Sequence, residues 1–247
     1  MSAVAIAKPY SSSDSERHLK QWLEAADRQQ DTALAAWMRE AAAASHPANP
    51  VIESLFGNSS FLSSLLLHHP DILRQCFDRT ADAAHADVLA DMSGGIDTLS
   101  QAELMRRLRL AKGRLALLVA VADIAGWWPL AKVTAILSDF AEQCLAHAIN
   151  ALLTQAEKRG EIILPHPDAS SRTSGVIVLG MGKLGGRELN YSSDIDLIVL
   201  FEAGRLGYKG RHNEQQFMNR LAHDLVHIMQ ERTADGYVFR TDLRLRP

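Results

Sequence analysis

The sequence lacks the features that mark secreted, membrane-spanning and nucleic-acid-binding proteins. It has only two cysteines, Cys76 and Cys144, whose wide separation matches no metal or disulfide spacing and fits a reducing compartment. No stretch approaches the roughly 18 uninterrupted apolar residues of a membrane span, and the apolar run near the N-terminus is too short for a secretory signal. The formal net charge is −3, so an anion site would need a local cluster of Arg and Lys. We therefore expect a cytoplasmic protein that binds neither membranes nor nucleic acid.

Apolar residues at helical spacing dominate the first part of the 247-residue chain. The ranges expected to be helical are 16–44, 58–68, a segment starting at Pro70, 101–125 and 130–159. Ser100 followed by Glu103 has the spacing of a capping box. At residues 162–175 Pro, Ser and Gly replace the Ala-rich and Leu-rich background, which indicates a domain border. We predict a disordered segment at 1–15, a helical region at 16–165 and a second domain at 166–247.

The second domain is expected to contain a small sheet. Runs of β-branched residues at 176–179 and 195–201 and the stretch 237–245 predict strands, while 213–232 has the spacing of an amphipathic helix. Helices followed by a small sheet favour an α+β fold. The expected architecture is an N-terminal helical region followed by a small mixed sheet with flanking helices.

Three glycines after the first predicted strand, Gly180, Gly182 and Gly185, have the G-x-G-x-x-G spacing of a dinucleotide-binding loop. That fold needs a crossover helix of roughly 10 residues or more between two parallel strands. Only residues 186–193 are available, and their Gly, Asn and Ser content favours a turn. We therefore reject the dinucleotide hypothesis and predict an antiparallel hairpin with a wide, glycine-rich connection.

Two aspartates, Asp194 and Asp196, stand at the start of the second predicted strand and project from the same face. Neighbouring carboxylates disfavour each other's charged forms, and a divalent cation relieves this conflict. Mg²⁺ prefers carboxylate oxygens and bridges to substrate phosphates. The glycines at Gly185 and Gly186 would let a phosphate approach the main chain. The pattern therefore favours phosphoryl chemistry assisted by a metal ion.

The segment VFRTDLRLRP at 238–247 supplies a third carboxylate. Strand alternation places Asp242 on one face together with Val238, Arg240, Arg244 and Arg246. An aspartate flanked by arginines could complete a metal site with phosphate-binding cations beside it. The alternative is an edge strand whose charged face is solvated and forms cross-strand ion pairs.

The string GMGKLGGRELNYSSDIDLIVLFE at 180–202 resembles the nucleotidyltransferase motif of the glutamine synthetase adenylyltransferase and adenylyl-removing enzyme family, within the polymerase-beta-like nucleotidyltransferase superfamily. Further segments are similar to the N-terminal half of that family in order and spacing: LFGNSSFLSSLLLHHPDIL (55–73), LRLAKGRLALLVAVADIAG (108–126), VTAILSDFAE (133–142) and YVFRTDLRLRP (237–247). The resemblance therefore covers nearly the whole chain after about residue 15.

The resemblance implies an enzyme that removes AMP from a tyrosine of glutamine synthetase by phosphorolysis and releases ADP. It implies that Asp194, Asp196 and Asp242 are catalytic residues that hold Mg²⁺. The residues that it implies for phosphate or nucleotide binding are Gly185, Gly186, Ser193, Lys183, Arg187, Arg244 and Arg246. For Arg187 a surface role is an equal alternative.

Proteins of this family carry two related nucleotidyltransferase domains, and the second attaches AMP from ATP to glutamine synthetase, which regulates nitrogen metabolism. The motif here is similar to the first copy, and the sequence stops at Pro247, so we expect a C-terminally truncated piece. The resemblance implies as partners glutamine synthetase, inorganic phosphate, ADP or ATP and, in the full-length protein, a signalling protein of the PII type. Two alternatives are a docking or regulatory module without turnover, and a general nucleotidyltransferase that acts on a small molecule or an RNA end.

Overall fold

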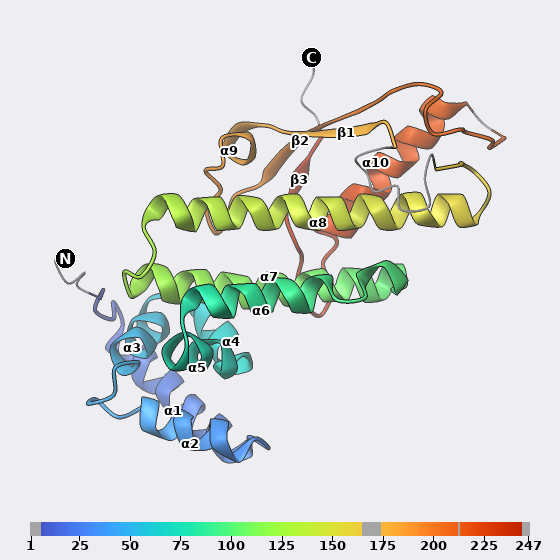
Figure 1. Ribbon diagram of the computed structural model, residues 1–247. Helices are drawn as coiled ribbons and strands as arrows, with labels where there is room; N and C mark the ends of the chain where they lie inside the picture. Colours follow the sequence, from blue (N-terminus) through green and yellow to red (C-terminus); the bar gives the residue numbers. More distant parts are fainter. Residues whose placement is uncertain (1–5, 165–173, 212, 244–247) are drawn as a thin grey trace. The chain divides into compact units, whose positions relative to one another are not determined.

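Helices make up most of the computed structural model, which describes residues 6–164, 174–211 and 213–243 (Figure 1). The first helices are Ser12–Arg28 (α1), Thr32–Ala41 (α2), Asn49–Asn58 (α3), Ser60–His68 (α4), Pro70–Asp78 (α5), Ala81–Ser93 (α6) and the short 3-10 helix Ile96–Thr98 (η1). The later elements are Gln101–Ile124 (α7), Leu130–Lys158 (α8), Val176–Gly180 (β1), Gly182–Gly185 (α9), Ile195–Phe201 (β2), Glu214–Gln230 (α10) and Thr241–Asp242 (β3). No helix within the described ranges is both long and apolar enough to cross a membrane.

The chain forms two compact units, and their borders fall inside α6, α7 and α8. The first unit comprises Met1–Met92 and Ala111–Val133, and the second comprises Ser93–Leu110 and Thr134–Pro247. Both α7 and α8 therefore contribute residues to each unit. The second unit includes residues on both sides of position 165, where the sequence predicts a domain border, because α8 from Thr134 onward belongs to the same unit as the sheet.

The core of the first unit is built around two aromatic side chains. Trp22 and Phe56 are almost fully buried and meet edge to face, with their ring centroids 6.2 Å apart. The indole N–H of Trp22 donates to the carbonyl oxygen of Met38 at 2.8 Å, so the one polar atom of this side chain is satisfied. These contacts join α1, α2 and α3.

Capping side chains set several helix boundaries. Helix α1 starts inside the segment expected to be disordered, because the Ser11 hydroxyl accepts a hydrogen bond from a main-chain N–H of its first turn. The helix expected at 16–44 is two helices, because the Asp31 carboxylate caps a new start at α2. The capping box predicted at the start of α7 is confirmed, with the Ser100 N–H donating to Oε2 of Glu103 at 2.9 Å.

The sheet of the second unit has the order β1-β2-β3. Strands β1 and β2 are antiparallel, in continuous register from Val176 opposite Phe201 to Gly180 opposite Leu197. This pairing confirms the predicted hairpin and excludes the parallel pair that a dinucleotide-binding unit needs. The connection begins with the short helix α9, and residues 186–193 after it contain turns and no helix, as predicted. The helices together with the mixed sheet confirm the predicted α+β class.

Strand β3 is shorter than the strand predicted at 237–245. Within the described residues, only Thr241–Asp242 pair with β2, and this pairing is parallel. Val238 and Phe239 are both buried, so the predicted alternation of a packed face and a charged face is wrong at these positions. The N–H groups of both residues donate to the Met229 carbonyl oxygen, at 2.9 and 3.0 Å. This stretch is therefore tied to the end of α10 before the chain enters the sheet.

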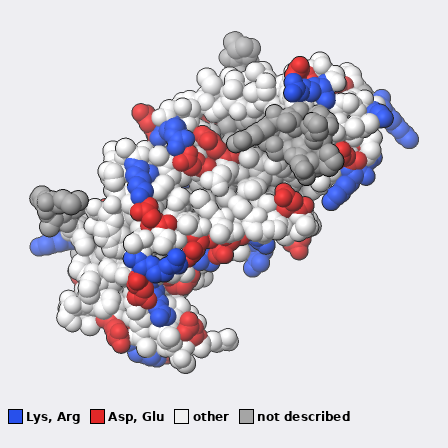
Figure 2. Space-filling view, in the orientation of Figure 1, with Lys and Arg blue, Asp and Glu red and all other residues white. Residues whose placement is uncertain are grey.

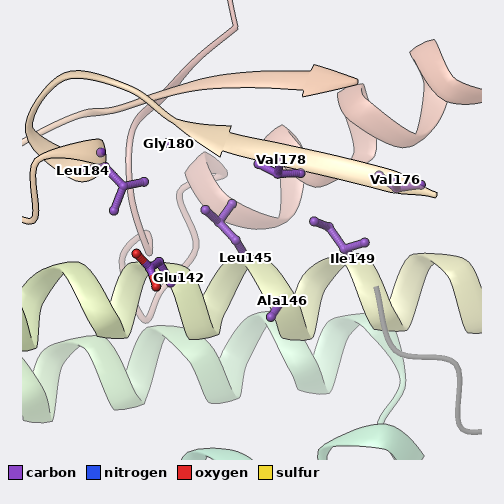
Figure 3. Close-up of a pocket in the computed structure, with 9 residues that line it drawn as sticks. Glu142, Leu145, Ala146, Ile149, Val176, Val178, Gly180 and Leu184 are labelled. Carbon is purple, nitrogen blue, oxygen red and sulfur yellow. The ribbon is translucent and has the colours of Figure 1, made fainter. Parts of the chain in front are cut away.

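The two faces of the sheet differ in their exposure. Val176 and Val178 face α8, as Figure 3 shows. By strand alternation, Ile177 and Leu200 project from the opposite face, and these residues are 48% and 47% exposed. Asp196 lies on this second face. The predicted carboxylate site is therefore on the more open side of the sheet.

Charges of both signs are mixed over the surface. Figure 2 shows Lys and Arg interspersed with Asp and Glu on the face in view. Several charged residues of the chain form exposed ion pairs, such as Arg205 with Glu202 at 2.7 Å. Exposed pairs contribute little to stability, so they do not determine the fold.

Candidate active site

Two of the three predicted carboxylates are direct neighbours in the sheet. Asp196 on β2 is the Cα partner of Asp242 on β3. Residues paired in parallel strands project from the same face, and neighbouring strands lie about 4.8 Å apart. Both residues are half-buried, so their charges are screened less than in bulk water. A cation between these side chains would offset their repulsion.

The third carboxylate, Asp194, is engaged by an arginine. It directly precedes β2 and forms an ion pair with Nε and Nη2 of Arg240. Nη2 also donates to the Ser192 carbonyl oxygen at 2.8 Å, and the Arg240 carbonyl oxygen accepts from the N–H of Ile195 at 2.9 Å. Arg240 directly precedes β3, and both its main chain and its side chain bind the segment that starts β2. Alternation placed Arg240 beside Asp242 but gave no signal for this bond to a residue 46 positions earlier.

The glycine-rich loop touches the same group of aspartates. Gly182 has a left-handed conformation, with φ +53°, and a Cβ added to it would lie 3.2 Å from Oδ2 of Asp196. A Cβ added to Gly185 would lie 2.4 Å from the carbonyl oxygen of Gly180, so this glycine allows the loop to pack on itself. The glycine beside the carboxylate is therefore Gly182. The phosphate-binding role expected for Gly185 and Gly186 stays a prediction.

Two of the predicted phosphate-binding side chains have partners of their own. The Ser193 hydroxyl donates to Oδ1 of Asn190 at 2.7 Å and accepts from the Asn190 N–H at 3.2 Å, which closes a local turn. Arg187 forms an ion pair with Asp139 on α8 at 2.6 Å. Each would have to exchange these partners to bind phosphate, so both roles stay predictions.

The other basic candidates lie on two separate segments. Lys183 is exposed on α9, one residue after Gly182. Arg244 and Arg246 lie outside the described residues. Their roles in binding phosphate therefore stay predictions from the sequence.

A buried arginine that we did not single out from the sequence anchors the segment leading to β3. Arg109 on α7 is 1% exposed. Its guanidinium donates to the carbonyl oxygens of Met105, Glu231 and Gly236, at 2.8, 2.5 and 3.0 Å. Burial lowers the pKa of Arg109, and the charges of Glu231 and Asp235 oppose that shift. The turn after α10 is thus fixed from α7, and no local pattern separates Arg109 from the other arginines around it.

Comparison with known proteins assigns the chain to a family. A family model described as glutamate-ammonia ligase adenylyltransferase matches residues 50–247. The chain belongs to this family. This agrees with the resemblance carried by the motif at 180–202.

Individual relatives are similar over much of the chain. The bifunctional glutamine synthetase adenylyltransferase/adenylyl-removing enzyme of Rhizobium meliloti (strain 1021) is 42% identical over 209 residues, covering 81% of this chain and 21% of that protein. The protein of the same name from Agrobacterium fabrum (strain C58 / ATCC 33970) is 51% identical over 145 residues, covering 59% of this chain and 15% of that protein. The chain thus spans about a fifth of the length of the first of these adenylyltransferase-family relatives.

The aspartates of this adenylyltransferase-family chain have the donor chemistry of a Mg²⁺ site. Asp194, Asp196 and Asp242 offer only carboxylate oxygens, which are the ligands that hard divalent cations prefer. The described residues contain no group of three or more His, Cys, Asp or Glu side chains arranged to hold a metal ion. The Asp194 carboxylate is instead directed to Arg240. The donor set therefore fits Mg²⁺ in its chemistry, and Mg²⁺ binding stays a prediction.

The pocket in Figure 3 is separate from these aspartates. Its volume is about 370 Å³, and it lies between α8 and β1, with Glu142, Leu145 and Val178 among its lining residues. Val178 projects from the sheet face opposite to Asp196, as strand alternation requires. The candidate active site of this family member is therefore the open aspartate face and not this pocket.

Proposed function

We propose that this chain is the part of a bifunctional enzyme that removes AMP from the adenylylated tyrosine of glutamine synthetase. The observation that carries the proposal is the pairing of Asp196 with Asp242 across β2 and β3, because phosphoryl transfer uses converging carboxylates to hold metal ions. Family membership supports the substrate, since curated relatives are named for both the addition and the removal of the adenylyl group. The resemblance of residues 180–202 to the first copy of the motif favours removal.

The proposed reaction is phosphorolysis. An oxygen of inorganic phosphate forms a bond to the phosphorus of the AMP group, and the bond from that phosphorus to the tyrosyl oxygen breaks. With HPO₄²⁻ as the nucleophile, its proton ends on the tyrosyl oxygen, and the products are ADP and an unmodified tyrosine. Two anionic groups must be aligned for this step, so cationic groups beside the reacting atoms are required.

The aspartates, Lys183 and Gly182 have different roles in the proposed reaction. Asp194, Asp196 and Asp242 would hold Mg²⁺, which supplies positive charge to polarise the phosphoryl oxygens. Lys183 extends from α9, next to the glycine that touches Asp196, and attracts the incoming phosphate. Gly182 leaves room for the Asp196 carboxylate against the loop, because any side chain at this position would meet Oδ2.

The test is an ADP-release assay. The 247-residue chain and a full-length relative are incubated with adenylylated glutamine synthetase, phosphate and Mg²⁺, and ADP is measured. The proposal expects release that depends on phosphate, and its loss in Asp194→Asn combined with Asp196→Asn. The matched control is Asp224→Asn, which removes an exposed carboxylate from α10 and should leave ADP release unchanged.

Three outcomes contradict the proposal. Unchanged ADP release by the double variant overturns the assignment of the aspartates. AMP release that needs no phosphate indicates hydrolysis instead of phosphorolysis. Binding of glutamine synthetase without any nucleotide release indicates a docking or regulatory module.

A further inference from the structure

Arg240 places a positive charge beside Asp194, next to the paired residues Asp196 and Asp242, and this charge is present without a metal ion. Its guanidinium contacts the Asp194 carboxylate through two nitrogens and donates to the Ser192 carbonyl oxygen at 2.8 Å. Asp196 and Asp242 are paired directly beside this ion pair. Within the described residues, the guanidinium of Arg240 thus engages Asp194 next to the paired positions of Asp196 and Asp242.

The contact between Arg240 and Asp194 is exchangeable. The two side chains are 55% and 54% exposed, so water and salt screen their attraction. The main chain of Arg240 is held separately, because its carbonyl oxygen accepts from the N–H of Ile195 at 2.9 Å. The side chain can therefore leave Asp194 while the pairing of β2 with β3 stays intact.

We infer that Arg240 is a positioning residue that holds Asp194 until a divalent cation binds, and then moves to an anionic phosphate group. A guanidinium and a divalent cation compete for the same carboxylate oxygen, so Asp194 joins the other two carboxylates only when Arg240 has left it. The released guanidinium carries its charge beside the site and matches phosphate oxygens in a fork geometry. The inference rests on the proposed function, since it takes the three aspartates as cation ligands.

The experiment measures cation affinity without turnover. Mn²⁺ is titrated into the 247-residue chain and followed by the electron paramagnetic resonance of unbound Mn²⁺. Arg240→Gln should lower the dissociation constant by about two- to fivefold, because the loss of an exposed competing ion pair is worth that much. A residue with a purely structural role would weaken cation binding or leave it unchanged when it is replaced.

The control variant is Arg205→Gln. Arg205 also forms an exposed ion pair, with Glu202, but it follows the far end of β2, and its replacement changes the net charge by the same amount. Its Mn²⁺ dissociation constant should equal that of the unmodified chain. If both variants bind Mn²⁺ more tightly to the same extent, net charge explains the gain and the inference is overturned.

A double-mutant cycle tests whether the competition passes through Asp194. In an Asp194→Asn background, Arg240→Gln should give a smaller gain in Mn²⁺ affinity than in the unmodified chain. An equal gain in both backgrounds overturns the displacement of Arg240 by the cation, as does the absence of any Mn²⁺ binding.

Nuclear magnetic resonance gives an independent test. The ¹⁵N signal of Arg240 Nε should shift when Mg²⁺ is added, and an unchanged signal contradicts the release of Arg240 from Asp194.

The binding of inorganic phosphate tests whether Arg240 moves to an anionic group. With saturating Mg²⁺, Arg240→Gln should weaken phosphate binding measured by calorimetry about two- to fivefold, opposite in sign to the cation effect. Unchanged phosphate affinity overturns the second half of the inference. If the unmodified chain releases ADP but Arg240→Gln leaves the cation affinity unchanged, the inference alone is refuted. If Arg240→Gln tightens cation binding but the unmodified chain releases no ADP, the proposed function alone is refuted.

Discussion

The two edges of β2 are built in different ways. On one edge, β1 pairs with β2 over five residue pairs, and the connection between them is the glycine-rich loop at 181–194. On the other edge, β3 contributes two residue pairs and arrives after a long excursion through α10. The first edge is a local hairpin, and the second depends on bonds between residues far apart in the chain.

The difference shows where the candidate active site depends on distant residues. Asp194 and Asp196 come with the hairpin strand, whereas Asp242 comes with β3. The segment before β3 is held by Arg109 of α7 and by the Met229 carbonyl oxygen at the end of α10. A residue more than a hundred positions before Asp242 therefore helps to place it.

Replacing Arg109 should give the largest difference in stability between the β3 edge and the hairpin edge of β2. Arg109→Met removes the donor to the carbonyl oxygens of Glu231 and Gly236, and these partly buried hydrogen bonds to a charged group are costly to lose. We expect the free energy of unfolding, measured with urea, to fall by about 3 kcal/mol. Amide exchange should increase more at 237–242 than at 176–180.

The control for Arg109 is Arg106→Met on the same helix. Arg106 is 70% exposed and lies 3.7 Å from Asp235, so its loss should change the free energy of unfolding by less than about 0.5 kcal/mol. Equal loss of amide protection at both edges in Arg109→Met would show that the anchor stabilises the whole unit and not the β3 edge.

The hairpin edge should be most sensitive at Gly185. A Cβ in Gly185→Ala would lie 2.4 Å from the main-chain oxygen of Gly180, so the loop and β1 must move apart. We expect a loss of about 2 kcal/mol in the free energy of unfolding, as for other overpacked sites. In Gly186→Ala the nearest atom is 3.5 Å away, and the change should stay below about 0.5 kcal/mol. Similar losses in both variants would contradict this packing role.

Gly182 couples the hairpin loop to the carboxylates. Gly182→Ala combines a φ of +53° with a contact of 3.2 Å to Oδ2 of Asp196, so it should cost about 1 kcal/mol and also weaken Mn²⁺ binding. Gly204→Ala has a φ of +80° and no atom within 4 Å of its Cβ, so it should cost a similar amount of stability without changing Mn²⁺ affinity. Equal Mn²⁺ affinities in the two variants would show that the contact with Asp196 is unimportant.

The sequence predicts the hairpin edge better than the β3 edge. The hairpin follows from a short-range fact, the small number of residues between Gly185 and Asp194, which leaves no room for a crossover helix. The extent of β3 depends on where Val238 and Phe239 find hydrogen-bond acceptors, and the Met229 carbonyl oxygen outside the sheet supplies them. Strand alternation cannot report such a bond, so the predicted strand at 237–245 begins four residues too early.

The candidate site also has a part that the sequence predicts and a part that it does not. The aspartates could be proposed from their spacing and from the family resemblance, and the register places Asp196 beside Asp242. The ion pair of Arg240 with Asp194 and that of Arg187 with Asp139 join segments whose proximity exists only after folding. Residue type alone shows that an arginine can bind phosphate, but its present partner is a property of the folded chain.

Acidification should give the smallest and most selective effect, at the contact of α8 with Ser93 and away from both edges of β2. Burial lowers the pKa of His147 on α8 below its ordinary value of about 6.5, and the charge of Asp97 opposes the shift. The unfolded chain therefore takes up this proton first, so the stability due to neutral His147 is full above about pH 6.5 and is lost as the pH falls through the lower folded-state pKa. His147→Gln should reduce the drop in urea midpoint between about pH 7.5 and 5.5. His223→Gln, at an 84% exposed position on α10, should leave that drop unchanged. Nε2 of His147 lies 3.4 Å from the Ser93 hydroxyl, so amide protection of the unmodified chain should fall first around His147 and at 93–98, and an earlier fall at 176–180 would contradict this placement.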